Sequence, residues 1–256
     1  MNVVVCVKQI PDPAVPGELD SDHTLKREGK LILDESDSYG VEMALQLVDK
    51  AGGGEVTLIS MAPNAEVSGL RTALAMGAAK AILVSDDALA GADALSTAKV
   101  LAKCVERAGE VDLVLTATES TDGYTGTIPA QVAELLGWPS LTFAKEIHLE
   151  GTTAKIQRQT EAGYDVVEAS LPAVVSVTAG VVEPRYPSFK GIMAAKSKPV
   201  DQVGTGDLGL DAAAVAANQT ITSVAAAPAR EAGEKIEDDG TAFEKVVEFL
   251  DGLKVI

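Results

Sequence analysis

Short apolar runs alternate with longer segments of helical period through the first half of the chain, and this alternation limits the possible folds most strongly. We expect buried strands at Val3–Val7, Glu55–Met61, Ala81–Val84 and Val111–Thr116. Segments with apolar residues on one helical face separate or follow them, at Val41–Val48, Leu70–Gly77, Leu95–Gly109 and Ile128–Gly137. Such alternation is typical of a parallel sheet with helices on both faces. The sequence therefore predicts an α/β fold with an open, mainly parallel sheet.

The pattern changes after Pro139, where strand-like segments follow one another without helices. They are Leu141–Leu149, Thr153–Gln159, Tyr164–Ser170 and Ala173–Thr178, separated by turn residues such as Glu150-Gly151 and Ala162-Gly163. We interpret these segments as antiparallel additions to one edge of the sheet.

The chain loses its apolar character beyond Ala195, which predicts two parts, 1–195 and 196–256. Residues 196–228 are rich in Gly, Ala, Ser, Thr and Asp, as expected of an extended arm. A terminal helix should follow, because Thr241 and Glu244 have capping-box spacing. Its apolar face would comprise Phe243, Val246, Val247, Leu250 and Leu253. This helix either folds back on its own sheet or clasps another subunit.

Charge and composition exclude several functions. The net charge of −17 argues against nucleic-acid binding, and no apolar run is long enough to span a membrane. Cys6 and Cys104 lie far apart, which favours a reducing cytoplasm over a disulfide framework. The first residues lack the basic start of a secretory signal. His23 and His148 are the only histidines, so we expect neither a metal site nor acid–base chemistry.

One loop combines the features of a ligand site. Residues 117–129 follow a predicted strand, are dense in hydroxyls and glycines, and lead into a helix with Pro129 in its first turn. Ligands of open parallel sheets bind outside the carboxyl ends of the strands, and a helix N-terminus attracts anions. The simpler alternative is helix capping by Thr125 or Thr127. The acidic stretch Asp34–Asp37 is, in the same way, most simply an N-cap cluster.

The segment Val182–Lys196 mixes prolines, aromatic residues and cations. Pro184 and Pro187 oppose regular helix, and no acid falls between Pro184 and Val200. It is either a crossing loop with Phe189 and Met193 tucked into the core, or a rigid protruding segment that offers an apolar knob and cations to another protein.

Three stretches resemble the electron transfer flavoprotein β subunits of bacteria, in order and at family-like spacing. They are V-K-Q-I-P-D from Val7, R-T-A-L-A-M-G-A from Arg71, and E-P-R-Y with G-I-M-A-A-K between Glu183 and Lys196. The arm motif Gly206-Asp207-Leu208-Gly209 is similar to that family as well.

The resemblance implies an adenine-nucleotide-hydrolase-like fold and a heterodimer with an α subunit that holds FAD. It also implies that the C-terminal arm contacts that subunit, and that this chain binds AMP, or a second FAD as in electron-bifurcating members. Carried over by position, the nucleotide site would comprise Cys6, Asp34, Glu35, Ser36, Asp37, Met61, Ala117, Thr118, Asp122, Gly123, Thr125, Gly126, Thr127 and Ile128. Partner docking would use Arg185, Tyr186, Phe189, Ile192 and Met193. Glu119 and Thr118 depart from the G-K-Q that many members carry, which weakens the case for a phosphate there.

The function implied is electron transfer from acyl-CoA-type dehydrogenases, as in fatty acid oxidation, to a quinone-linked acceptor, by a carrier subunit without catalytic residues of its own. Two other readings remain open at this point. The chain could be a self-contained ATP-using enzyme, although Lys8–Asp12 is not the Ser/Gly-rich loop such enzymes have after the first strand. It could also be a nucleotide-sensing module of the universal-stress kind.

Overall fold

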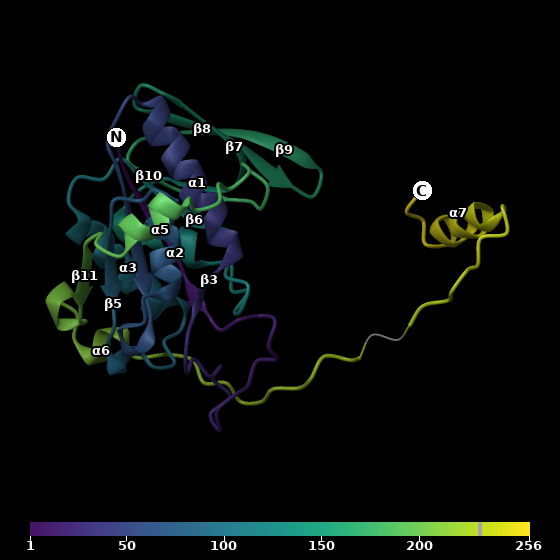
Figure 1. The fold of residues 1–256 in the computed structure, drawn as a ribbon, viewed down its shortest axis with the longest axis horizontal. Helices are drawn as coiled ribbons and strands as arrows, with labels where there is room; N and C mark the ends of the chain where they lie inside the picture. The colour runs from purple at the N-terminus through teal and green to yellow at the C-terminus, as the bar shows by residue number, and fades with distance from the viewer. Residues whose placement is uncertain (230–231) are drawn as a thin grey trace. The chain divides into compact units, whose positions relative to one another are not determined.

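The computed structural model describes residues 1–229 and 232–256, and the chain divides into two compact units, Met1–Ile221 and Thr222–Ile256. The first unit is built on a nine-stranded sheet of order β11-β5-β4-β1-β6-β10-β7-β8-β9 (Figure 1). Its strands are β1 (Asn2–Cys6), β4 (Glu55–Met61), β5 (Lys80–Val84), β6 (Leu113–Ala117), β7 (Ser140–Glu150), β8 (Thr153–Thr160), β9 (Gly163–Ser170), β10 (Ala173–Val177) and β11 (Val200–Val203). A small antiparallel pair, β2 (Gln9–Ile10) and β3 (Ile32–Leu33), lies outside it.

Helices cover both faces of the parallel part, as the sequence predicts. They are α1 (Glu35–Lys50), α2 (Ser68–Met76), α3 (Ala94–Ala108), α4 (Ile128–Leu136), α5 (Phe189–Ala195) and α6 (Ala212–Val215), with short 3₁₀ turns η1 (Pro63–Ala65), η2 (Asp87–Leu89) and η3 (Gly206–Leu208). Val3 and Val5 of β1 pack with α1 and α2, whereas Val4 and Cys6 pack with α3 and α4. The strand is thus buried on both faces, which explains its uninterrupted apolar run.

The β-rich continuation is antiparallel only at its outer edge. β8 pairs antiparallel with β7 and with β9, and Figure 1 shows this ribbon extending beyond α1. The expectation was wrong for β10, which lies parallel between β6 and β7. All residues of β10 are buried, as befits a central strand. An apolar run predicts such burial, but it does not tell which strands lie beside it.

The arm begins later than the sequence suggests. Residues 200–203 form β11, which pairs parallel with β5 and makes the other edge of the sheet. Val203, Leu208 and Val215 are buried against the α3 and α4 face. The division of the chain therefore falls after Ile221 and not after Ala195, because this short edge strand and the turns after it pack on the sheet.

The second unit contains α7 (Ala242–Gly252), the predicted terminal helix, which buries none of its residues. The expected capping box does not form, because the Thr241 hydroxyl donates to Asp239 Oδ1, at 2.7 Å, instead of capping the helix. Whether α7 packs on its own sheet or on another subunit stays a prediction. Within residues 1–229 and 232–256, no helix has the length and hydropathy that a membrane crossing requires.

Candidate functional site

The carboxyl ends of β4, β1 and β6 lie side by side, at the point where the strand order reverses. Beyond β1 the chain goes on to β4 and β5, and it then returns to pair β6 with the other edge of β1. Cys6, Met61 and Ala117 are the last residues of β1, β4 and β6, so they lie together at the carboxyl end of the parallel strands. Such a switch in strand order is where ligands of open α/β sheets bind. The loop 117–129, which the sequence predicts as a ligand site, starts at this carboxyl end, after β6.

Part of the predicted site shares one face of the sheet. Cys6, Met61 and Ile128 all pack in the apolar cluster beneath α3 and α4. Burial raises the pKa of the Cys6 thiol far above its ordinary value, so the group stays protonated and apolar in character. Cys6 can therefore contribute packing at the base of a ligand site, but no thiolate.

The acidic stretch holds the loops together from the α1 side. Asp34 is the N-cap of α1, as predicted, and accepts the Ser36 amide at 3.1 Å. Its other oxygen accepts the amide and the hydroxyl of Thr121, at 2.7 and 3.1 Å. Asp37 is buried and accepts the Lys8 amide, and burial raises its pKa well above the usual range. Both carboxyls thus join α1 to the loops after β1 and β6, whereas Glu35 is exposed.

Asp122 in loop 117–127 forms ion pairs with two cations. Its Oδ1 lies 2.6 Å from Lys8 Nζ, and its Oδ2 pairs with the guanidinium of Arg27. Lys8 Nζ also donates to Ser120 Oγ at 3.2 Å. Burial opposes ionisation of Asp122, but the hydrogen bond from Lys8 and the charges of both cations outweigh it and lower the pKa of the carboxyl. The sequence analysis missed Arg27, since nothing in its surroundings points to a partner so far along the chain.

The N-terminus of α4 has the features of an anion site. Thr127 occupies the N-cap position without making a side-chain capping bond, and Pro129 stands in the first turn. The alternative of plain capping by Thr127 is therefore wrong. Gly126 has φ of +70°, a backbone conformation that favours glycine. Unused amides and the exposed hydroxyls of Thr125 and Thr127 suit a phosphate.

A buried hydroxyl supports the fit of a nucleotide. Thr116 on β6 is 4% exposed, and its Oγ1 has no hydrogen-bond partner among the described residues. Such a group is costly unless something binds it. One neighbour opposes an anion, however. Glu119 Oε2 comes within 3.3 Å of the place a Cβ on Gly126 would take. A phosphate at α4 would share its surroundings with this carboxylate, while Asp122 already engages Lys8 and Arg27.

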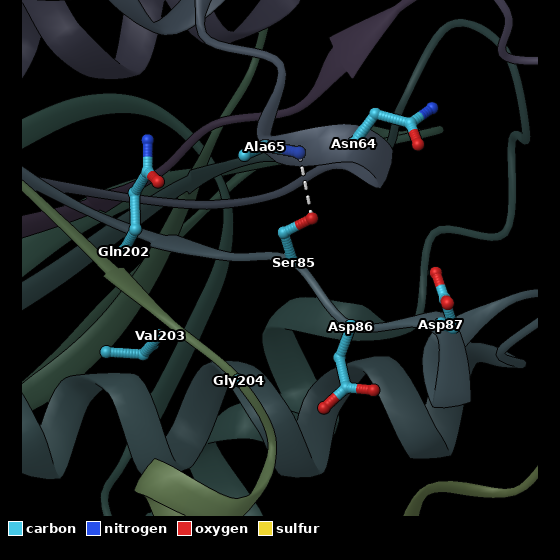
Figure 2. Close-up of a pocket in the computed structure, with 8 residues that line it drawn as sticks. All are labelled: Asn64, Ala65, Ser85, Asp86, Asp87, Gln202, Val203 and Gly204. Carbon is cyan, nitrogen blue, oxygen red and sulfur yellow. Dashed lines mark hydrogen bonds between the residues drawn. The ribbon is translucent and has the colours of Figure 1, made fainter.

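A separate hollow of about 520 Å³ opens at the carboxyl ends of β4, β5 and β11 (Figure 2). It is lined by Asn64, Ala65, Ser85, Asp86, Asp87, Gln202, Val203 and Gly204. The Ala65 amide donates to Ser85 Oγ at 2.9 Å across it. Asp86 is already engaged, because its Oδ2 accepts the amide and the hydroxyl of Thr205. None of the sequence-predicted site residues lines this hollow, so it is distinct from the switch-point loops.

The segment 182–196 presents an apolar outer surface. Pro184 and Pro187 precede α5, which begins after Ser188 caps it by accepting the Gly191 amide at 3.0 Å. The prolines therefore do not exclude a helix here; they end just before it. We call Tyr186, Phe189, Ile192 and Met193 the outer face of α5, and all four are exposed, Tyr186 at 92% and Phe189 at 81%. The alternative that Phe189 and Met193 are tucked into the core is wrong.

Arg185 differs from these four residues, because its guanidinium pairs with a buried carboxylate although the side chain is 42% exposed. Its Nε donates to Glu42 Oε2 at 2.6 Å, and its NH2 group donates to Oε1 at 3.0 Å. This bidentate pair ties the segment to α1. Arg185 therefore anchors the segment and is not a free cation on the outer face of α5.

Comparison with known proteins agrees with the fold and with the sequence resemblance. Residues 22–208 match the family described as the electron transfer flavoprotein domain. The chain is 39% identical to an electron transfer flavoprotein subunit beta of Mycobacterium bovis, with 100% of this chain and 99% of that protein covered. It is 34% identical to one of Megasphaera elsdenii, with both chains fully covered, and 36% identical to the caffeyl-CoA reductase-Etf complex subunit CarD of Acetobacterium woodii, with 96% and 95% covered. The chain thus belongs to the electron transfer flavoprotein family, whose beta subunits it matches along its whole length.

Proposed function

We propose that this chain is the β half of a heterodimeric electron carrier that takes electrons from acyl-CoA-type dehydrogenases and passes them to a quinone-linked acceptor. FAD, held mainly by an α subunit, supplies the redox chemistry when bound. The chain's own part is to form one wall of the flavin site, to bind an adenine nucleotide, and to dock the dehydrogenases.

The observation that carries the docking role is the outer face of α5. Large apolar side chains rarely stand so exposed together on one short segment unless another protein covers them. Lys190 and Lys196 lie on the same segment, in which no acid falls between Pro184 and Val200. In a chain of net charge −17 this local excess of cations is unusual, and it favours a partner whose surface is apolar with acidic surroundings.

The nucleotide would lie at the start of α4. The amides and hydroxyls of Thr125, Gly126 and Thr127 would hold its phosphate, and Thr116 would meet a polar atom of the ligand. Cys6, Met61 and Ile128 would form the apolar base beside it. AMP is the first candidate, and a second FAD is the alternative that an electron-bifurcating carrier would use.

We further propose that the second unit contacts the α subunit. Phe243, Val246, Val247 and Leu250 of α7 form one stripe together with the C-cap residue Leu253, and none of them is buried within its own unit. A short amphipathic helix of this kind gains its stability from packing against another surface. Removal of residues 222–256 should therefore weaken heterodimer assembly.

The experiment that tests the proposal is co-purification with the α subunit encoded by the same organism. The heterodimer is denatured, and the released FAD and AMP are quantified by chromatography. We expect one FAD for each heterodimer, plus either one AMP or a second FAD. A heterodimer that releases neither flavin nor adenine nucleotide would refute the proposed function.

A further inference from the structure

α5 is seated on α2 through a contact that only glycine permits. A Cβ added to Gly191 would lie 2.4 Å from the carbonyl oxygen of Ala75, near the end of α2. Ala195, one turn further along, is buried against the same cluster. The inner face of α5 is thus flat, and it places the helix backbone directly on α2. Phe189, Ile192 and Met193 consequently point away from that contact.

Cations fasten the C-terminal end of α5. Arg71 of α2 donates to the carbonyl oxygens of Ala195 and Lys198, at 2.6 and 2.7 Å. In return, Lys198 Nζ donates to the carbonyl oxygens of Leu74 and Ala78 at the end of α2, at 2.9 and 2.6 Å. These reciprocal bonds join the chain at the end of α2 to the chain at the end of α5. They fix where α5 ends and how it lies on α2.

The Glu42–Arg185 pair fastens the N-terminal side. The Glu42 side chain is 5% exposed, and its Oε1 also accepts from Gln46 Nε2 at 2.8 Å. Since Arg185 is bound at both carboxylate oxygens, the guanidinium has a single orientation. Tyr186 follows directly, and Phe189 lies four residues beyond Arg185. The contact therefore fixes the chain just before the outer face of α5 begins.

We propose that these contacts hold α5 in its binding position before any partner arrives, and that Glu42 and Arg71 are positioning residues for dehydrogenase docking. This inference rests on the docking role proposed above. A helix as short as α5 does not persist in water without tertiary support. If α5 were ordered in only a fraction of the free molecules, the apparent affinity for the partner would be reduced by that fraction. The three contacts remove that loss.

The test measures electron transfer from a reduced acyl-CoA dehydrogenase to the purified heterodimer. Glu42→Gln keeps the size of the side chain and removes the ion pair, and Gly191→Ala lifts α5 without changing any charge. We expect each to raise KM for the dehydrogenase about tenfold while kcat at saturation and FAD content stay unchanged. Glu42→Asp, which restores the charge, should recover part of the lost affinity.

Matched controls come from the opposite face of the sheet, where α3 packs. Asp201→Asn removes the Arg107 pair between α3 and β11, and Gly206→Ala adds a methyl group where nothing lies within 4 Å. Both should leave KM unchanged. If Glu42→Gln and Gly191→Ala also leave KM unchanged while Phe189→Asp raises it, the inference is wrong and the docking role stands. If Phe189→Asp is silent too, the docking role itself fails.

Hydrogen exchange of the wild-type heterodimer gives an independent reading should a variant fail to assemble. Amides in α5 should be protected before the dehydrogenase is added, and protection should change little when it binds. Exchange of these amides at the rate of an unstructured peptide, followed by protection on binding, would overturn the inference.

Discussion

Replacing Asp122 with Asn tests the ion pairs of the nucleotide loop. The Asp122 side chain is 8% exposed, whereas Lys8 and Arg27 are 39% and 28% exposed. Removing one partner of a fully buried ion pair costs about 3–5 kcal/mol, and an exposed pair contributes about 0–1 kcal/mol. Because the acid is buried but both cations reach water, we expect Asp122→Asn to lower the free energy of unfolding by about 2 kcal/mol.

Urea unfolding of the full-length chain measures this loss. Trp138, the single tryptophan, lies just past the C-terminal end of α4, away from loop 117–127, and reports on unfolding of the whole domain by fluorescence. A loss of about 2 kcal/mol should lower the midpoint by about 1 M urea. As a control, Asp201→Asn removes a carboxylate that is 51% exposed, and it should cost under about 1 kcal/mol.

The pH dependence follows from the pKa of Asp122. Its ion pairs lower the pKa of the folded state below the unfolded value of about 3.9. The contribution of this carboxylate is therefore fully present above the unfolded pKa, and it is lost as pH falls through the folded pKa. The gap between wild type and Asp122→Asn should be complete near pH 7 and shrink below about pH 4. Equal midpoints of the two proteins at neutral pH would refute the reasoning.

Three further changes have expected outcomes. Phe189→Asp should raise KM for the dehydrogenase at least about tenfold with FAD content and its absorption spectrum unchanged, because a hot-spot apolar anchor is lost; loss of flavin would instead show a structural role. Glu119→Gln should tighten AMP binding about tenfold by calorimetry, since it removes a negative charge beside Gly126, and unchanged affinity would mean that the phosphate lies elsewhere. Thr116→Val should raise the stability of the nucleotide-free chain by about 1 kcal/mol yet weaken nucleotide binding, because the unpartnered hydroxyl is costly only until a ligand meets it; a loss of stability without nucleotide would contradict this.

The sequence predicts the parallel part of the fold well because each element carries its own signal. Ile128 to Leu136 form α4 with the predicted end at Gly137, and Glu55–Met61 is a strand with the predicted bounds. β11 carries almost no signal, since four residues with two valines in a Gly- and Ser-rich stretch do not stand out. The neighbours of β10 depend on pairing with distant strands, which no local pattern encodes.

The site shows the same limit. The position of loop 117–127 follows from general rules on parallel sheets. The four-residue spacing of Phe189 and Met193 fits a buried face and an exposed face equally well, so only the structure shows that both residues face outward. The partners of Asp122 do not follow, because Arg27 is 95 residues away and lies in an irregular loop. The pairing of Arg185 with Glu42 does not follow either, since Glu42 lies 143 residues away in α1.

Rapid mixing tests the central claim most directly. The heterodimer of this chain with its α subunit is mixed with an acyl-CoA dehydrogenase reduced by substrate, and the flavin absorbance of the heterodimer is followed. We predict that the heterodimer's flavin is reduced and then reoxidised by the quinone-linked acceptor, and that this chain alone accepts no electrons. Flavin that stays oxidised in the heterodimer, or electron transfer by this chain without any α subunit, would contradict the account.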